Sequence, residues 1–179
     1  IVPDWDERNY ESEYLIKICP AMAFGTGHHE STQLVISQML RLKAGNYGSL
    51  LDLGTGSGIL AILASKMGIE KIRAIDVDDV CEENFYQNCK LSNVENIDIQ
   101  IKDVHMHNDY DYDIILANID KNNIIKILDK YQDSQTNAIM IIAGILSSDL
   151  DEIRNYMPNC KIEDTDILGE WASVVVKNK

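Results

Sequence analysis

Basic residues are scarce in this sequence of 179 residues, where 16 Lys and Arg stand against 29 Asp and Glu and leave a net charge of −13. No run of basic residues occurs anywhere along it. A surface with this charge repels a phosphate backbone and favours a basic protein partner. The charge balance therefore argues against direct binding of nucleic acid.

Cysteines and long apolar stretches are also few. The four cysteines, Cys19, Cys81, Cys89 and Cys160, form no Cys-x-x-Cys pair, so we expect reduced thiols and a cytoplasmic protein. No apolar stretch approaches the length that spans a membrane, and we expect no membrane partner. A hydrophobic content of 45% at this length is enough for one domain with a core of its own.

The most informative segment, Leu50 to Ile59, joins an apolar strand to a helix through a turn of alternating glycines. Gly54, Gly56 and Gly58 can adopt positive φ angles and leave no Cβ between the turn and a ligand. A dinucleotide fingerprint would need its third glycine at position 59, which is an isoleucine here. With Asp52 two residues ahead of it, the pattern instead resembles the first motif of S-adenosylmethionine-dependent methyltransferases of the Rossmann-like type.

A second acid follows at a useful distance. The run Lys71 to Asp76 predicts a strand that ends in Asp76, 18 residues past Gly58. A carboxylate near this interval accepts two hydrogen bonds from the vicinal hydroxyls of a ribose. Taken singly, Asp52 is equally well explained as a turn cap and Asp76 as a solvated strand end. The ordered set of strand, glycine turn, helix, strand and acid favours a cofactor site.

Beyond Asp76 the pattern alternates between helix and strand, which is typical of a parallel sheet covered by helices on both faces. The nearly continuous apolar run Tyr112 to Asn118 predicts a strand buried on both faces. Ser148 and Asp151 match a capping box ahead of a later helix. We therefore predict a Rossmann-like α/β fold with a mostly parallel seven-stranded sheet, helices on both faces and a C-terminal antiparallel hairpin.

Five segments together make the resemblance to one family specific. They are Ala23 to His29, Asp52 to Gly58, Leu116 to Ile119, Ala143 to Leu146, and Gly169 to Trp171. Over essentially the whole chain, these segments resemble the catalytic domain of ribosomal protein L11 methyltransferases, the PrmA family. Members carry a small N-terminal substrate-recognition domain. The resemblance thus implies that residues 1–12 are the remnant of a linker and that residues 13–179 form the S-adenosylmethionine-dependent domain.

The resemblance also implies an activity. Such enzymes transfer methyl groups from S-adenosylmethionine to lysine ε-amines and the N-terminal amine of a large-subunit ribosomal protein, and they release S-adenosylhomocysteine. In-line displacement at the sulfonium methyl needs a neutral amine held behind the methyl carbon. Positioning and desolvation can supply most of the rate, so no metal or strong nucleophile is required. The expected partner is a basic ribosomal protein.

Asn118 is the candidate for the residue that positions the amine. It ends the predicted strand at the carboxyl edge of the sheet, where ligands bind in open α/β folds, and its amide oxygen can accept a hydrogen bond. Relatives that methylate amides or bases read Asn-Pro-Pro-Tyr here, whereas Ile119, Asp120 and Lys121 follow in this chain. That difference disfavours planar nitrogen substrates. The alternative role for Asn118 is an N-cap of the following helix.

Further cofactor contacts come from the same resemblance, which implies that the loop with Phe24, Thr26 and Gly27 closes over the cofactor. The Thr26 hydroxyl would bond the methionine end. The alternative is a glycine-rich turn that only caps the next helix. Asp103 would accept from the adenine amino group and Val104 would cover the ring, although this acidic loop can also be explained as solvated.

The four histidines receive no firm role. His105 and His107 have the spacing of a metal-ligand pair, but no third ligand accompanies them, which disfavours zinc. The roles of His28 and His29 stay open. The helix that follows them is predicted to turn one apolar stripe to the core, formed by Val35, Ile36, Met39 and Leu40.

Three other functions remain as alternatives. The first is a non-catalytic module that keeps the cofactor fold without transfer activity. The second is a nicotinamide-dependent Rossmann-like enzyme, which the isoleucine at position 59 disfavours. The third is another class I methyltransferase that acts on RNA or a small molecule, and this would need a basic or aromatic substrate face that the sequence does not show.

Overall fold

The computed structural model describes residues 1–20, 27–42 and 46–179. The main sheet contains the strands β3 (Ser49–Leu53), β4 (Lys71–Asp76), β5 (Ile97–Ile101), β6 (Ile114–Asn118), β7 (Ile139–Leu146), β8 (Cys160–Leu168) and β9 (Trp171–Asn178). The helices are α1 (Glu30–Leu42), α2 (Ile59–Lys66), α3 (Val80–Leu91), α4 (Lys121–Ser134) and α5 (Leu150–Asn155). Two 3₁₀ turns, η1 (Val104–Met106) and η2 (Ser147–Asp149), complete these elements.

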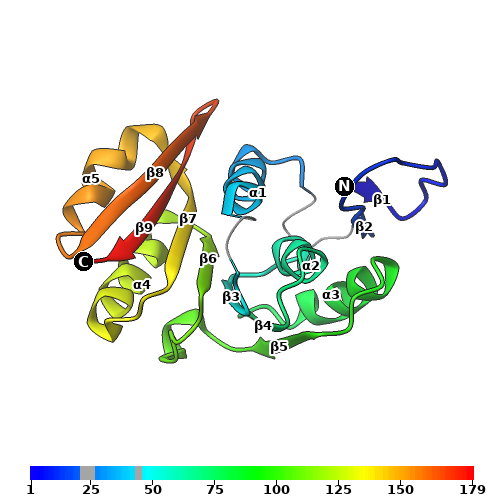
Figure 1. Cartoon of the computed structure of the whole chain (residues 1–179), viewed down its shortest axis with the longest axis horizontal. Helices are drawn as coiled ribbons and strands as arrows, with labels where there is room; N and C mark the ends of the chain where they lie inside the picture. The colour runs from blue at the N-terminus through cyan, green and yellow to red at the C-terminus, as the bar shows by residue number, and fades with distance from the viewer. Residues whose placement is uncertain (21–26, 43–45) are drawn as a thin grey trace.

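The strand order is β5-β4-β3-β6-β7-β9-β8 (Figure 1). Neighbours from β5 to β7 pair in parallel, and β9 pairs antiparallel with both β7 and β8. The predicted seven-stranded, mostly parallel sheet with a terminal antiparallel hairpin is therefore confirmed. The chain leaves β3 toward one edge and returns at β6 toward the other, so the loops after β3 and β6 lie next to each other. Ligands bind at this kind of switch point in open α/β sheets.

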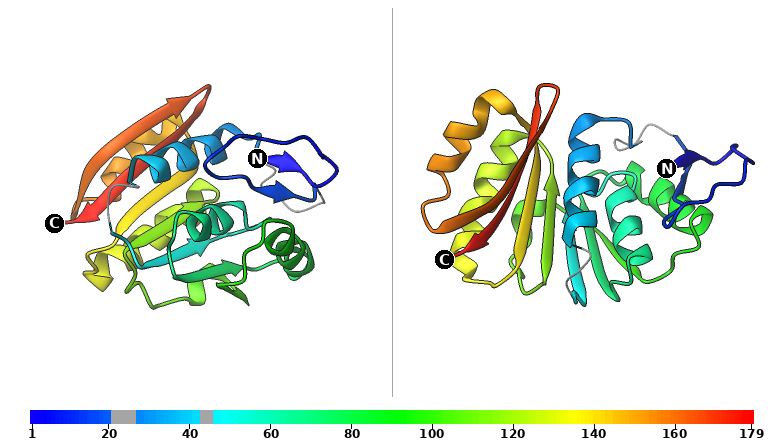
Figure 2. Two further views of the ribbon diagram at one scale, coloured as in Figure 1. Left: turned by 45° about the vertical axis from the view of Figure 1, so that its right-hand side comes forward. Right: turned by 45° about the horizontal axis from the view of Figure 1, so that its top comes forward.

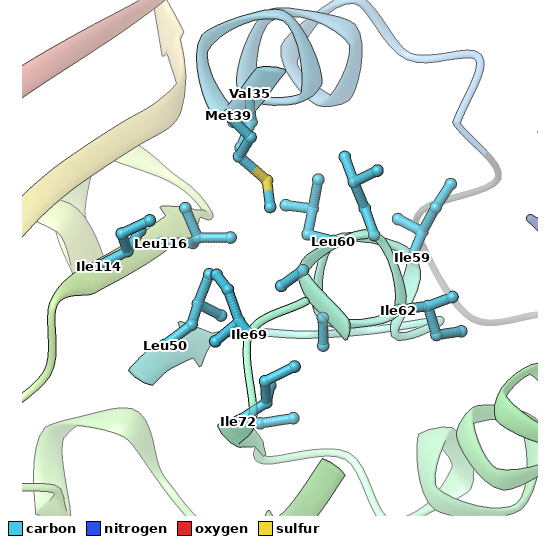
Figure 3. Packing of buried hydrophobic residues seen from close by; sticks show 14 of the residues in the cluster. Val35, Met39, Leu50, Ile59, Leu60, Ile62, Ile69, Ile72, Ile114 and Leu116 are labelled. Carbon is cyan, nitrogen blue, oxygen red and sulfur yellow. The ribbon is translucent and has the colours of Figure 1, made fainter. Parts of the chain in front are cut away.

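Helices cover both faces of the sheet (Figure 2). Alternate residues of the central strands point to opposite faces, so Leu50 lies in a core with α1, α2 and α3, whereas Leu51 lies in a core with α4 and α5. In the first core, Val35 and Met39 point from α1 toward Leu60 (Figure 3). Because both faces are buried, the strands read as continuous apolar runs rather than alternating ones.

The N-terminal segment forms a small parallel pair of its own, β1 (Val2–Pro3) with β2 (Lys17–Ile18). The sequence of Glu13 to Cys19 predicts a short strand, of which the structure forms only two residues. Polar side chains of α3 hold it in place: Ser92 Oγ donates to the Lys17 carbonyl at 2.9 Å, and Asn88 Oδ1 accepts from the Cys19 amide at 2.7 Å. These side-chain bonds replace the longer ladder that the apolar pattern predicted.

Two local predictions are wrong. In α1, Val35 and Met39 are buried but Leu40 is 41% exposed, because the helix packs against α2 on one side and against β7 and β9 on another. Its buried face is consequently shifted and includes the polar Thr32 and Gln38. The predicted capping box does not form either, since its serine lies inside η2 and its acid pairs with Arg154.

Among the residues that the structure describes, no helix combines the length and the apolar character needed to cross a bilayer.

Candidate functional site

A cavity of about 860 Å³ opens at the carboxyl edge of the parallel strands. The segments that follow β3, β4, β5 and β6 contribute to its wall, and so do Gly144 within β7 and Trp171 at the start of β9. Representative wall residues from these segments are Gly54, Asp76, Asp103, Asn118, Gly144 and Trp171. The topology thus gathers into one wall most of the residues that the sequence suggested for a site.

The glycine turn forms one side of the cavity. Gly54 and Gly56 line it, while Gly58 and Asp52 lie behind the turn and outside the described part of the wall. Gly54 has a φ of 78°, and a Cβ built there would lie 2.3 Å from Cγ2 of Ile119. The sequence interpretation attributed this glycine to ligand approach. The structure adds a second reason, the close packing of the β6–α4 loop against the turn.

Asp76 ends β4, and its carboxylate holds the turn. Its Oδ2 accepts from the Gly56 amide at 2.8 Å, and its Oδ1 accepts from the Asp78 amide at 3.1 Å. Each carboxylate oxygen can accept a second hydrogen bond, so both remain able to bind a ligand. Asp76 lines the cavity and is only partly exposed, which differs from a freely solvated strand end.

Asp52 lies beneath the turn and is 1% exposed. Its Oδ2 accepts from the Thr55 hydroxyl at 2.7 Å, as a residue that caps the turn would. Burial raises the pKa of Asp52 to about 7, the Thr55 bond opposes the shift, and the negative charge of Asp76 adds to it. Thr55 itself lines the cavity, so any effect of Asp52 on a ligand passes through Thr55.

Asn118 ends β6 in the cavity wall. Its Nδ2 donates to Oγ1 of Thr32 at 3.2 Å, whereas its Oδ1 is buried and has no hydrogen-bond partner among the described residues. The N-cap of α4 is Asp120, whose side chain accepts from the amides of Asn122 and Asn123. The helix-cap alternative for Asn118 is therefore wrong. A buried unpaired carbonyl costs about 1–3 kcal/mol, so this oxygen is available to a ligand.

The glycine-rich loop is described only in part. Phe24 and Thr26 lie outside the described residues. Gly27 has a φ of 83°, and a Cβ built on it would lie 2.8 Å from Cδ1 of Ile1 and 2.9 Å from Cδ1 of Ile59. Gly27 therefore packs against apolar side chains, and it is not part of the described cavity wall.

His29 and Trp171 form the part of the wall nearest α1. Nδ1 of His29 lies 2.8 Å from the Ser31 hydroxyl, and the His29 carbonyl accepts from the amides of Thr32 and Gln33, so His29 starts the helix. Its ring meets the Trp171 ring edge-on, with 4.6 Å between the ring centres. Thr26 and His28 are the capping candidates by sequence, but in the structure His29 takes this position.

The loop after β5 closes the opposite side. Oδ1 of Asp103 accepts from the His105 amide at 2.8 Å and so caps η1, which Val104 begins. Both residues line the cavity. His107 is buried, which lowers its pKa, and its Nε2 lies 2.6 Å from the Asp109 carbonyl. The described part of the chain holds no group of three His, Cys, Asp or Glu side chains arranged for a metal ion.

Sequence reasoning missed Thr32, Ile119 and Gly144. Gly144 sits at an irregularity of β7 with a φ of 82°, and a Cβ there would lie 2.3 Å from the Ile119 carbonyl oxygen. A glycine inside an apolar strand signals a bulge or a close backbone approach, and a threonine on a helix face signals a buried polar contact. Neither signal identifies the residue in contact, because that residue belongs to another helix, strand or loop.

Comparison with known proteins gives one consistent result. The profile of the family "Ribosomal protein L11 methyltransferase (PrmA)" matches residues 1–179. Curated relatives of that name from Caldicellulosiruptor saccharolyticus and Dictyoglomus turgidum are each 35% identical, and the matches cover 99% and 100% of this chain. The chain spans only 59% and 60% of their lengths.

Solved structures agree with the sequence comparison. The ribosomal protein L11 methylase of Lactobacillus delbrueckii subsp. bulgaricus superposes with a TM-score of 0.90 at 27% identity, and the match covers 99% of this chain and 94% of that one. The precorrin-6y C5,15-methyltransferase of Geobacter metallireducens gives 0.67 at 11% identity, covering 87% of this chain and 92% of that one. At that identity the second likeness shows a common fold and nothing more.

Proposed function

The chain belongs to the ribosomal protein L11 methyltransferase (PrmA) family, and on that premise we propose that it transfers methyl groups from S-adenosylmethionine to protein amines. The acceptors are lysine ε-amines and the N-terminal amine of a large-subunit ribosomal protein. One observation carries the proposal: the unpaired amide oxygen of Asn118 lies in the same cavity wall as the glycine turn and Asp76. An acceptor for an amine and a cofactor cradle thus share one cavity.

The residues of the wall suit this cofactor. Asp76 keeps acceptor capacity beside the turn for two ribose hydroxyls. Val77 and Val104 are apolar wall residues near Asp103, where an adenine ring would lie. The volume of about 860 Å³ lies in the range of small-molecule sites. The cofactor would supply the sulfonium methyl group, and none of the chemistry asks for a metal.

Asn118 and Thr32 carry the positioning step. Thr32 is 1% exposed, and its hydroxyl oxygen accepts from the Asn118 amide nitrogen, which fixes the amide and leaves its oxygen without a partner among the described residues. That oxygen accepts an N–H of the neutral amine and aims the nitrogen lone pair. Holding the reacting atoms in line in a site without bulk water can account for a large part of the barrier reduction.

The charge of the chain fits the proposed partner. With a net charge of −13, the molecule attracts a basic protein and repels free nucleic acid. We therefore place the substrate among basic proteins of the large ribosomal subunit rather than among RNAs.

Methyl transfer from radiolabelled S-adenosylmethionine tests the proposal. The chain is incubated with extract from cells that lack the endogenous activity, and the products are separated by size and charge. We expect one labelled small basic ribosomal protein, with label released on lysine and N-terminal amines after hydrolysis. Label in RNA would support the other methyltransferase class, and cofactor binding without any transfer would support a non-catalytic module.

A further inference from the structure

A hydrogen-bond chain crosses the cavity wall between α4 and η1. Nδ2 of Asn123 donates to Oδ2 of Asp120 at 2.6 Å, and Oδ1 of Asn123 lies 2.7 Å from Nε2 of His105. All three side chains belong to residues that line the cavity. The backbone of His105 is held as well, because its amide donates to Asp103 and its carbonyl accepts from Lys130.

This chain fixes the tautomer of His105. An ionised carboxylate can only accept hydrogen bonds, so Asn123 must turn its NH₂ group to Asp120 and its oxygen to His105. The amide oxygen in turn requires a hydrogen on Nε2 of His105. In a neutral imidazole the other nitrogen, Nδ1, then carries no hydrogen and is an acceptor.

That acceptor has no use within the described protein. Nδ1 of His105 is buried and lacks a hydrogen-bond partner among the described residues. Leaving a buried acceptor without a partner is unfavourable, and a ligand with an N–H group would remove that cost. His105 is two residues from Asp103, its backbone amide donates to Oδ1 of that residue, and both residues line the cavity, so one loop brings two acceptor side chains to the same wall.

We propose that His105 is a second acceptor, beside Asp103, for the exocyclic amino group of the adenine ring. An amino group has two N–H bonds, and two neighbouring acceptors can take one each. A 6-oxo purine would instead bring a carbonyl oxygen against two acceptors, which is repulsive, so the site selects 6-amino purines. The inference rests on the proposed cofactor and adds a selectivity that depends on His105 and, through it, on Asn123.

Calorimetric titration with S-adenosylhomocysteine and its 6-oxo analogue, S-inosylhomocysteine, tests this role. His105→Phe keeps a planar ring and removes both nitrogens. We expect it to weaken binding of the adenosyl ligand roughly threefold to tenfold, as one neutral hydrogen bond predicts, and to strengthen binding of the inosyl ligand, because one of the two repelling acceptors is gone. The ratio of the two affinities should therefore fall by more than the loss of adenosyl affinity alone. Asn123→Ala no longer holds His105 in one tautomer, and it should lower the affinity ratio less than His105→Phe does.

His107→Phe is the matched control, because it makes the same change on the same loop but outside the described cavity wall. Its affinity ratio should equal that of the wild type. An unchanged ratio in both His105→Phe and Asn123→Ala overturns the inference, and so does an equal fall in His107→Phe. Wild-type protein that is folded but binds neither ligand overturns the proposed function as well, so the two failures are distinguishable.

Discussion

In Asn118 the amide nitrogen is paired and the amide oxygen has no partner among the described residues, and this arrangement makes a specific prediction. Asn118→Ala should leave the affinity for S-adenosylhomocysteine within a few-fold of the wild type. The turnover rate on a protein amine should fall roughly thirty-fold to thousand-fold, because the lost contact forms mainly in the transition state. This loss corresponds to a rise of about 2–4 kcal/mol in the activation free energy. Calorimetry and initial-rate kinetics give the two quantities separately.

The control is Asn122→Ala, an exposed amide at the start of α4 that is not part of the described wall. It should behave like the wild type in both measurements. If Asn118→Ala instead lost binding and rate to the same extent, Asn118 would hold the methionine end of the cofactor and not the amine.

Asp76 is predicted to hold the ribose. Asp76→Ala should weaken binding of S-adenosylhomocysteine by about 1.5–3 kcal/mol, the range for hydrogen bonds to a charged group. Asp79→Ala removes a nearby exposed carboxylate that makes no cap hydrogen bond, and it should leave the affinity unchanged. Equal affinities for all three proteins would move the ribose contact elsewhere, with Asp78 as the next candidate.

The raised pKa of Asp52 leads us to expect that the stability of the fold depends on pH. Its folded-state pKa of about 7 lies above the ordinary value of 3.8. Between about pH 4 and pH 7, Asp52 therefore keeps its proton in the folded protein and loses it in the unfolded chain. The contribution of Asp52 to stability is therefore full below about pH 4 and declines as the pH rises toward 7. Asp52→Asn should remove this decline while the side chain still accepts from Thr55.

Urea unfolding at pH 5 and pH 8 measures the effect. The loss of unfolding free energy between the two pH values should be smaller in Asp52→Asn than in the wild type. Parallel losses in the two proteins would show that Asp52 is already ionised at pH 5 in the folded state.

Several residues could be identified from the sequence because their chemistry depends on local spacing. Asp76 and the glycines of the turn follow one another within one strand–turn–helix–strand unit. Thr32 could not be found this way, since its partner Asn118 is 86 residues away and the two meet only when α1 packs beside β6. The tautomer of His105 depends likewise on α4.

The loop between β6 and α4 is an element whose position depends on two glycines. Ile119 lies between Gly54 of the glycine turn and Gly144 of β7, and each glycine would clash with it if it carried a Cβ. The loop that follows Asn118 is thus held between the glycine turn and the next strand. The irregularity in β7 at Gly144 provides the room.

Gly144→Ala should disturb this arrangement. Its Cβ would meet the Ile119 carbonyl oxygen at 2.3 Å, and its φ of 82° is unfavourable for alanine, so we expect a loss of stability of more than about 2 kcal/mol and a large loss of turnover. Thermal unfolding and methyl-transfer kinetics measure the two effects.

Gly68→Ala is the control that separates the effect of backbone strain from the effect of the clash with Ile119. Gly68 has a φ of 93°, but nothing lies within 4 Å of its Cβ position. This variant should lose about 1–2 kcal/mol of stability from backbone strain alone and keep its turnover. Equal effects of the two substitutions on turnover would show that the contact with Ile119 does not position Asn118.

The ends of two central strands were predictable, because a polar residue, Asp76 or Asn118, closes each apolar segment. The strand predicted over Lys71 to Asp76 has those bounds in the structure, whereas the run predicted over Tyr112 to Asn118 becomes a strand only at Ile114. The apolar stripe of α1 was not predictable from its period, because the helix packs against two elements and buries polar residues toward the cavity. The capping-box motif failed because η2 occupies the segment ahead of α5.

At the scale of the whole molecule, the strand order decides where the site lies. The chain passes from β3 to β4 and β5 on one side and continues with β6 and β7 on the other side, which places the loops after β3 and β6 together. The neighbouring strands add Asp76, Asp103 and Gly144 to the same wall. The alternation of helices and strands made the fold class predictable. The pairing of β1 with β2 was not, because a two-residue ladder held by α3 leaves almost no pattern in the sequence.

The central claim is that the cavity at the carboxyl edge binds the methyl donor and its product. The most direct test is calorimetric titration of the folded chain with S-adenosylhomocysteine and S-adenosylmethionine in buffer that contains a metal chelator. We expect saturable binding of both ligands at one site per chain. The absence of binding for either ligand, in protein whose circular dichroism shows the mixed α/β fold, would contradict it.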